Sequence, residues 1–251
     1  MLLDVILRTH DRSSLHAYSP RVIDVPKPEM VRRCVISLVR ALEGVEHTLT
    51  ILDDHSTDET LEFLHRQGPV IETGPGNNLS LLTAVDGAGA SRADLVYMVE
   101  DDYLHWPGAI QEMLCFVELA KERGLPSVAL HPYDDHDNYT HGADRESHIV
   151  VGRDRHWRTN TYSTATVMAE PWLFREEQWE KLAREYDRPG QGVHEGTTIS
   201  NLWGHRVALF TPLPSLAVHL CGNVPPLVDC HQLWDQNALE KEHDRQNIRS
   251  G

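Results

Sequence analysis

The sequence is poor in cysteine and has no long hydrophobic run. Its four cysteines include no Cys-x-x-Cys pair, which excludes a zinc ribbon and a thioredoxin-type redox motif. No apolar stretch approaches the ~18 residues that a transmembrane helix requires. The N-terminal apolar segment is interrupted by Asp4, so it does not resemble a signal peptide. We therefore expect a protein of the cytoplasm, without a transmembrane segment.

Several common catalytic motifs are also missing. There is no P-loop of the form Gly-x-x-x-x-Gly-Lys-Ser/Thr and no Gly-x-Ser-x-Gly segment of an α/β-hydrolase. The glycine-containing stretch 74–78 lacks the third glycine of a dinucleotide-binding fingerprint. His194 and Glu195 would begin a zinc-protease motif, but Thr198 stands where the second histidine is required. These absences exclude four common classes of enzyme.

Positive charge is scarce. Lysine and arginine number 23 against 38 aspartates and glutamates, which gives a formal net charge of −15. A chain this acidic is not expected to bind nucleic acid or an anionic membrane through its overall charge. An anionic ligand would need a local source of positive charge, such as a metal ion, a helix N-terminus or a few well-placed arginines.

The first 131 residues alternate between patterns typical of strands and of helices. Short apolar segments separated by helix-length amphipathic segments predict a parallel sheet built from βαβ units. Ser56 and Glu59 form a capping-box pattern at the start of one predicted helix. Strands are predicted at 2–7, 49–52, 70–71, 95–99 and 127–130, and helices at 28–42, 56–67, 79–90 and 107–123.

The remaining sequence is less regular but contains no repeat or low-complexity linker, so we expect a single continuous α/β domain over 1–251. We divide it into a first half, 1–131, a second half, 132–220, and a polar tail, 221–251. A long loop rich in Asp and His is predicted at 131–148. Strands are predicted at 162–169, 207–210 and 216–220, and helices at 171–186 and 195–203.

Two acidic motifs lie directly after predicted strands. Three consecutive carboxylates at 100–102 follow the strand 95–99, and two at 53–54 follow the strand 49–52. Ligands of open α/β sheets bind beyond the carboxyl ends of the strands. Adjacent carboxylates repel one another unless a cation or water relieves them, and their oxygens suit Mg²⁺ or Mn²⁺. Taken alone, the first motif is equally compatible with a solvated acidic turn and the second with helix capping.

Three motifs follow one another along the first half. They read Val-Ile-Leu-Arg-Thr-His-Asp at 5–11, Leu-Thr-Ile-Leu-Asp-Asp-His-Ser-Thr-Asp at 49–58 and Leu-Val-Tyr-Met-Val-Glu-Asp-Asp at 95–102. In this order and spacing they resemble the nucleotide-binding half of GT-A glycosyltransferases, most closely the inverting family-2 type. The last segment is similar to the acidic DxD-type motif of that family. The resemblance implies a Rossmann-like, mostly parallel sheet flanked by helices.

The resemblance also implies roles for individual residues. Asp102 would be the direct metal ligand, and His219, at the end of the last predicted strand, a further one. Glu195, at the start of a predicted short helix, would be the catalytic base, with Asp187 and His194 as the nearest rivals. The nucleotide-sugar donor would contact a set of polar residues drawn mainly from the three motifs: Arg8, Thr9, Asp11, Asp54, Asn78, Glu100 and Asp101.

By the same resemblance, we expect a metal-dependent glycosyltransferase. It would move a sugar from a nucleotide-diphosphate sugar, with UDP favoured, to a hydroxyl of a carbohydrate or another acceptor, with inversion. Mn²⁺ or Mg²⁺ would neutralise the leaving diphosphate as a Lewis acid. No nucleic-acid partner is expected.

Two other classes of function stay open. A nucleotidyltransferase also uses acidic metal ligands on a similar sheet, but it would need a glycine-rich loop after the first strand, and residues 8–14 contain no glycine. A catalytically silent GT-A module could bind a glycan or a protein partner. Such a module need not keep the acidic motif at 100–102, which is intact in this sequence.

Overall fold

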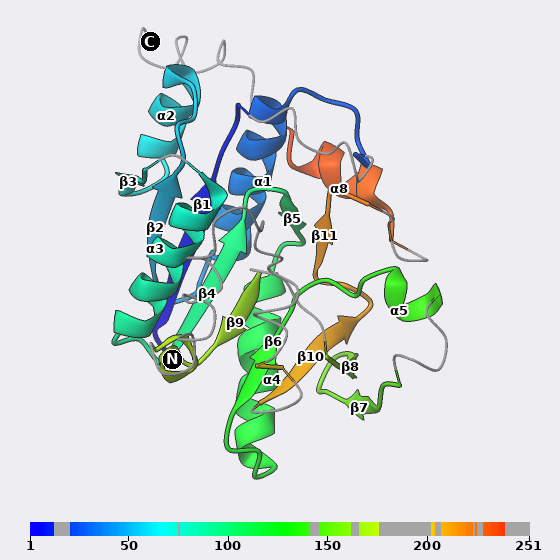
Figure 1. The fold of residues 1–251 in the computed structure, drawn as a ribbon. Coiled ribbons are helices and arrows are strands. Elements are labelled where there is room, and N and C mark those ends of the chain that lie inside the picture. Colours follow the sequence, from blue (N-terminus) through cyan, green and yellow to red (C-terminus); the bar gives the residue numbers. More distant parts are fainter. Residues whose placement is uncertain are drawn as a thin grey trace, which may run out of the picture.

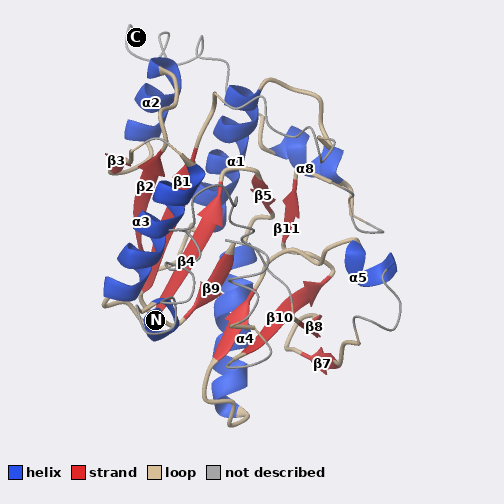
Figure 2. Ribbon diagram, viewed as in Figure 1, coloured by secondary structure: helices blue, strands red, loops and turns tan. Residues whose placement is uncertain are grey.

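A nine-stranded sheet forms the central layer of the computed structural model, and helices cover both of its faces (Figure 1, Figure 2). A second sheet of two short strands lies beyond the tip of β4 (Leu95–Glu100), which is in the middle of the first sheet (Figure 1). The structure describes residues 1–12, 21–74, 76–140, 146–161, 166–175, 202–203, 207–222, 224 and 228–238.

The elements have the following bounds. The large sheet contains β1 (Leu3–Thr9), β2 (His47–Asp53), β3 (Val70–Glu72), β4 (Leu95–Glu100), β6 (Val128–Leu130), β7 (Ile149–Val151), β8 (His156–Asn160), β9 (Val167–Ala169) and β10 (Ala208–Leu213). The small sheet contains β5 (Tyr103–His105) and β11 (Ala217–His219). The helices are α1 (Lys27–Ala41), α2 (Asp58–His65), α3 (Asn77–Ala90), α4 (Ala109–Glu122), α5 (Asp137–Thr140), the 3-10 helix η2 (Pro171–Phe174) and α8 (Cys230–Gln236). Of these described helices, none combines the length and the apolar character needed to cross a membrane.

The strand order of the large sheet is β3-β2-β1-β4-β9-β6-β10-β8-β7. β1 pairs in parallel with β2 and β4, and β2 pairs in parallel with β3. β9 runs antiparallel to both β4 and β6, and β8 runs antiparallel to both β10 and β7. All strands of this sheet except β8 and β9 therefore point the same way, which confirms the predicted mostly parallel sheet.

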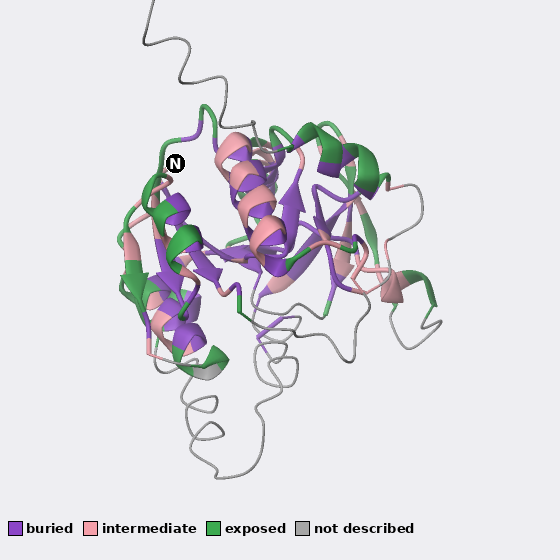
Figure 3. Cartoon of the chain, turned by 90° about the horizontal axis from the view of Figure 1, so that it is seen from above, coloured by how far each residue is buried: buried purple, intermediate pink, exposed green. Residues whose placement is uncertain are grey.

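Alternation along β1 divides the core into two layers. Leu3, Val5 and Leu7 pack in the cluster that includes α1 and α4, whereas Ile6 packs on the other face with α3. Successive side chains of a strand point to opposite faces, so a strand covered on both sides must be apolar throughout. β4 follows this rule, with every residue before Glu100 buried. Figure 3 shows the buried strands between helices whose outer surfaces are more exposed.

Helix α1 begins and ends within one residue of the predicted helix 28–42. Pro28 stands in its first turn, where a missing N–H interrupts no intrahelical hydrogen bond. Gly44 lies just beyond the helix with φ of 78°, a left-handed conformation that glycine adopts without strain. Between them, Val31, Val35 and Leu38 are buried against the sheet. Each such side chain stabilises the fold by about 1.5–3 kcal/mol.

The predicted capping box at the start of α2 is wrong. Thr57 is the residue before the helix, and its own side chain does not cap the first turn. Instead, Asp11 accepts hydrogen bonds from the Thr57 N–H at 2.9 Å and from the Thr57 hydroxyl at 2.6 Å. The loop after β1 therefore fixes the start of α2, and Ser56 donates its N–H to Asp53.

Other differences concern short elements. α5 lies within the predicted loop 131–148, and β5, β7, β8 and α8 have no counterpart among the predicted elements. Strands of three to five residues are too short for a two-residue period to stand out. Of the predicted helix 171–186, the structure describes only residues 171–175, and Pro171–Phe174 form the 3-10 helix η2. Most of the predicted helix 195–203 lies outside the described residues.

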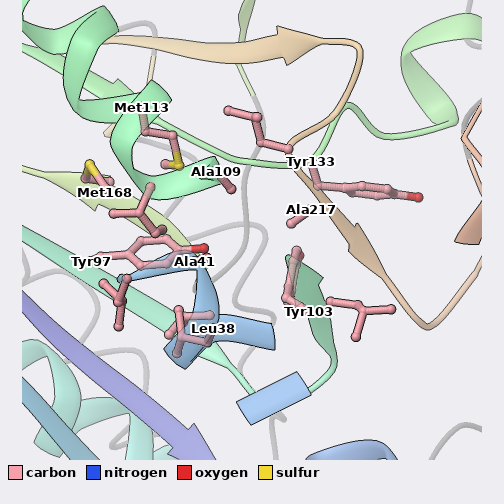
Figure 4. Close-up of a cluster of buried hydrophobic side chains, with 14 of the residues drawn as sticks. Leu38, Ala41, Tyr97, Tyr103, Ala109, Met113, Tyr133, Met168 and Ala217 are labelled. Atoms are coloured by element: carbon pink, nitrogen blue, oxygen red, sulfur yellow. The ribbon is translucent and has the colours of Figure 1, made fainter. Parts of the chain in front are cut away.

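A buried tyrosine–histidine pair connects β4 with β5. The Tyr97 hydroxyl lies 2.7 Å from His105 Nε2. Figure 4 shows Tyr97 among side chains of α1, α4 and β9. Burial raises the pKa of Tyr97, so its hydroxyl keeps the proton and can donate a hydrogen bond to Nε2. Burial lowers the pKa of His105 to about 4, so its ring is neutral at neutral pH.

The neutral His105 predicts sensitivity to acid. The pKa of an unfolded histidine is about 6.5, and the pKa of His105 in the folded protein is about 4. The unfolded chain therefore binds a proton first as the pH drops from about 6.5 to about 4, and the free energy of unfolding should fall over this range. We expect His105→Gln to remove about 3 kcal/mol of this fall. Urea unfolding at a series of pH values measures it, with His65→Gln on the exposed side of α2 as the control. An unchanged pH dependence in His105→Gln would show that the ring is not held neutral.

Candidate functional site

The carboxyl ends of β1, β2 and β4 meet at one edge of the large sheet. In the parallel pairs, Thr9 lies opposite Asp53 and Arg8 lies opposite Glu100. The two acidic motifs of the sequence therefore lie on either side of the end of β1, at the edge where open α/β sheets bind ligands.

Asp53 is fully buried at the end of β2. Its Oδ1 accepts a 2.8 Å hydrogen bond from the Thr9 hydroxyl, and its Oδ2 accepts one of 2.8 Å from the Ser56 N–H. Hydrogen bonds to a charged group contribute about 1.5–3 kcal/mol. Asp53 therefore joins β1, β2 and the turn before α2, and it engages the Thr9 hydroxyl that we predict to hold the nucleotide.

The next carboxylate, Asp54, reaches the start of α3. Both of its oxygens lie 3.1 Å from the Gly76 nitrogen, whose N–H donates to them. Gly76 precedes the helix with φ of 113°, a conformation that favours glycine. The positive end of the helix dipole also stabilises a carboxylate at this position. Asp54 therefore fixes the start of α3 beside the strand ends.

Arg8 extends from β1 toward β4 and α3, and it is buried. Its Nη1 donates to Glu100 Oε1 at 3.3 Å, and its Nε donates to Ser80 Oγ at 3.2 Å. Its Nη2 donates to the Asn77 carbonyl at 3.1 Å and to the Asn77 side-chain oxygen. The guanidinium thus offsets the charge of Glu100 and holds the first turn of α3. Asn78 lies in that turn, but its side chain is outside the described part of the chain.

Both carboxylate oxygens of Asp101 accept hydrogen bonds from other groups of the protein. Lys27, the first residue of α1, donates to Oδ1 at 2.6 Å, and the His10 N–H donates to Oδ2 at 2.7 Å. Burial alone would lower the pKa of Lys27, but Asp101 and Asp102 outweigh burial and raise it. Burial raises the pKa of Asp101, and Lys27 opposes that change. The short contact identifies a buried ion pair between the acidic motif and α1.

Asp102 faces β11 instead. Its Oδ2 lies 3.2 Å from His219 Nε2 and 3.6 Å from Cys221 Sγ. The ligand atoms of these three residues all lie within 4.8 Å of one another. β11 runs antiparallel to β5 with His219 opposite Tyr103, which brings the end of β11, the last of the described strands, beside the acidic motif (Figure 1).

Aromatic rings hold the side chain of His219. It stacks on Tyr103 with ring centroids 4.7 Å apart and planes 12° apart, and it meets the edge of Tyr133 at 6.2 Å. Burial lowers the pKa of His219, but the carboxylate of Asp102 outweighs burial and raises it well above its ordinary value. A metal ion at this position would compete with that proton, because a ligating histidine is neutral.

The three donor atoms fit a divalent cation. Oxygen and nitrogen ligands lie about 2.1 Å from an ion such as Zn²⁺ and thiolate sulfur about 2.3 Å, so neighbouring ligands of a tetrahedral site are about 3.4–3.6 Å apart. The two separations from Asp102 Oδ2, 3.2 Å and 3.6 Å, are close to these values, and all three ligand atoms lie within 4.8 Å of one another. The structure thus brings together the two predicted metal ligands, Asp102 and His219, and adds Cys221.

Local sequence patterns indicate some of the residues at this edge and miss others. For Lys27 there is no local signal, since its partner Asp101 is 74 positions away. Cys221 follows His219 by two residues, and such spacing on an extended segment places both side chains on one side. Asp11 lies at the same edge but binds the start of α2 through Thr57.

The predicted base cannot be placed beside these groups. Glu195 and its rivals, Asp187 and His194, all lie outside the residues that the structure describes.

Known proteins resemble this chain in structure but not detectably in sequence. The sequence matches no family model and no curated protein. The galactosyltransferase LgtC, solved in complex with donor and acceptor sugar analogs, matches with a TM-score of 0.52 and 11% identity, over 97% of this chain and 99% of that one. An active-site mutant of LgtC matches with a TM-score of 0.54 and 11% identity, over 96% and 99%.

A second relative is TarS from S. aureus. It matches with a TM-score of 0.50 and 14% identity, over 99% of this chain and 42% of TarS. This chain spans 60% of a shorter TarS structure. Together with LgtC, these matches show that the chain has the GT-A glycosyltransferase fold.

The buried ion pair of Lys27 and Asp101 leads to a stability prediction. We expect Lys27→Met to destabilise the fold by about 3–5 kcal/mol, because it leaves a buried carboxylate without its cation. The double variant Lys27→Met/Asp101→Asn should recover part of this loss, since asparagine can still accept from the His10 N–H. Chemical unfolding measures both. Arg66→Met, which breaks an exposed pair with Glu62, is the control and should cost less than about 1 kcal/mol. A double variant no more stable than Lys27→Met would argue against a charged pair.

Proposed function

We propose that this chain is a glycosyltransferase that uses a nucleotide-diphosphate sugar. The observation that carries the proposal is the cluster of Asp102, His219 and Cys221 at the carboxyl edge of a GT-A sheet. LgtC, which shares the fold, was solved with donor and acceptor sugar analogs. A cation site at the strand ends supplies what an acidic chain needs to bind a diphosphate.

Two buried cationic side chains among the described residues of this edge are already paired with carboxylates. Arg8 is paired with Glu100, and Lys27 is paired with Asp101. A bound Mn²⁺ or Mg²⁺, the ions that the sequence resemblance implies, would act as a Lewis acid and neutralise the leaving diphosphate. Asp102 would hold such an ion together with His219, whose ring is already oriented by stacking.

Two carboxylates are proposed to contact the nucleotide directly. Asp54 would accept a hydrogen bond from the uracil ring N–H with lone pairs that Gly76 does not use, and UDP is therefore the favoured nucleotide. Glu100, with 24% of its side chain exposed, would accept one from a ribose hydroxyl. The other predicted donor-binding residues with described side chains are buried and bond to groups of the protein itself, so we propose that they position these two carboxylates and the loops beside them instead of contacting the donor: Arg8, Thr9, Asp11 and Asp101.

Transfer also needs a base for the acceptor hydroxyl. We propose Glu195, with inversion at the sugar, on the strength of the sequence resemblance. The carboxylate would take the proton of the acceptor hydroxyl as its oxygen attacks the sugar and the diphosphate leaves. Replacement of the base by its amide typically slows such a step by about 10²–10⁴.

Binding of the donor should depend on a cation held by Asp102. We expect wild-type protein to bind UDP in the presence of Mn²⁺ and to lose most of this affinity in EDTA. Asp102→Asn should bind UDP weakly in both conditions, because the amide is a poor metal ligand. Isothermal titration calorimetry measures the affinities, with Asp86→Asn on the exposed surface of α3 as the control. Undiminished UDP binding in EDTA would overturn the metal-dependent proposal.

The role of Asp54 predicts discrimination between nucleotides. Uracil carries a ring N–H at the position where cytosine carries an acceptor, so Asp54 should favour UDP over CDP. We expect Asp54→Ala to weaken the binding of UDP by about ten- to a hundredfold, because a charge-assisted hydrogen bond is lost, and to change the affinity for CDP much less. Equal loss of both nucleotides, together with a lower melting temperature, would instead indicate that Asp54 only fixes the start of α3.

A further inference from the structure

We propose that the Cys221 thiolate is a third protein ligand of the cation at Asp102 and His219, and that it makes the site prefer Mn²⁺, Co²⁺ and Zn²⁺ to Mg²⁺. The sequence resemblance provides the first two ligands only. The inference deepens the proposed function, on which it rests for the role of the ion in binding the donor.

The backbone places His219 and Cys221 on the same side. They lie two residues apart, and the segment is extended, since β11 ends at His219 and Cys221 forms an antiparallel bridge with Arg21. Alternate residues of an extended segment point the same way. Both side chains consequently face Asp102, at 3.2 Å and 3.6 Å from its Oδ2.

Hydrogen bonds hold this segment from both sides. The Leu220 N–H donates to the Asp102 carbonyl at 2.8 Å, and the Val22 N–H donates to the Leu220 carbonyl at 3.0 Å. The stacked ring of Tyr103 orients His219, and Cys221 itself is buried. The ligand atoms are therefore in place before an ion binds, which reduces the cost of ordering them.

The donor atoms decide which ions bind. Mg²⁺ requires six oxygen ligands in near-octahedral geometry and retains several waters, so a sulfur and a nitrogen donor suit it poorly. Thiolate and imidazole favour the transition ions, with affinity rising from Mn²⁺ to Co²⁺. On binding, Cys221 and the ring of His219 would each release a proton to the solvent, and the sulfur and Nε2 would then bond to the metal.

Cobalt provides a direct test, because a thiolate bound to Co²⁺ produces a charge-transfer absorption in the near ultraviolet that oxygen and nitrogen ligands do not. We would strip the purified full chain with chelator, titrate it with CoCl₂ without nucleotide, and record spectra. We expect the absorption in the wild type and in two control variants. Cys34→Ala removes a buried cysteine of α1 outside the cluster, and Cys115→Ser removes a partly exposed one.

Cys221→Ser should lose the absorption, and its affinity for Co²⁺ should fall by about a hundredfold, whereas its affinity for Mg²⁺ should change little. Thermal unfolding of each variant checks that it is folded. A wild-type spectrum without the charge-transfer absorption at saturating Co²⁺ would overturn the inference without any variant. Retention of the absorption in folded Cys221→Ser would overturn it as well.

The test of Cys221 as a metal ligand can fail or succeed separately from the test of the proposed glycosyltransferase function. If thiolate ligation is found but UDP does not bind with any ion, the metal site stands and the glycosyltransferase proposal fails. If UDP binds in a metal-dependent way without thiolate ligation, the inference about Cys221 fails and the proposed function stands.

Discussion

Mutual repulsion among carboxylates is the constraint on which this edge of the sheet depends. Parallel register brings the acidic ends of β2 and β4 to either side of β1, so several negative charges share a buried region. The chain relieves each one with a different group. Asp54 accepts from a backbone N–H, Glu100 faces the guanidinium of Arg8, and Asp101 faces the ammonium of Lys27. Without such partners a buried carboxylate would be protonated or the fold destabilised.

The same contacts assemble the surrounding elements. Arg8 and Asp54 both bind the first turn of α3, Lys27 brings the start of α1 to the acidic motif, and Asp11 fixes the start of α2. Helix N-termini are favourable places for negative charge, which accounts for Asp11 at α2 and Asp54 at α3. Helix α1 is held differently, by the ion pair of the Lys27 side chain with Asp101. The architecture of the site and its charge balance are therefore inseparable.

The sequence predicts the part of this arrangement that local patterns encode. Apolar strands followed by acidic residues define β2 and β4, and the carboxyl-edge rule places Asp54 and Asp102 at one site. Lys27 and the pairing of β5 with β11 depend on contacts between residues far apart in the chain, and strands of three residues carry too little periodicity to reveal them. The capping pattern at Ser56 failed for a related reason, because a more distant residue, Asp11, supplies the hydrogen bonds.

The small sheet separates two residues of the acidic motif, Asp101 and Asp102, which face different elements. β4 ends at Glu100 and β5 begins at Tyr103, so Asp101 and Asp102 occupy the connection and face different partners. Asp101 faces α1 and serves the fold, whereas Asp102 faces β11, where His219 and Cys221 lie. A cation bound by these residues would connect β11 to the end of β4. At a hundred times its dissociation constant it would stabilise the folded chain by about 2.7 kcal/mol. Metal binding at this cluster would thus be coupled through Asp102 to the docking of β11.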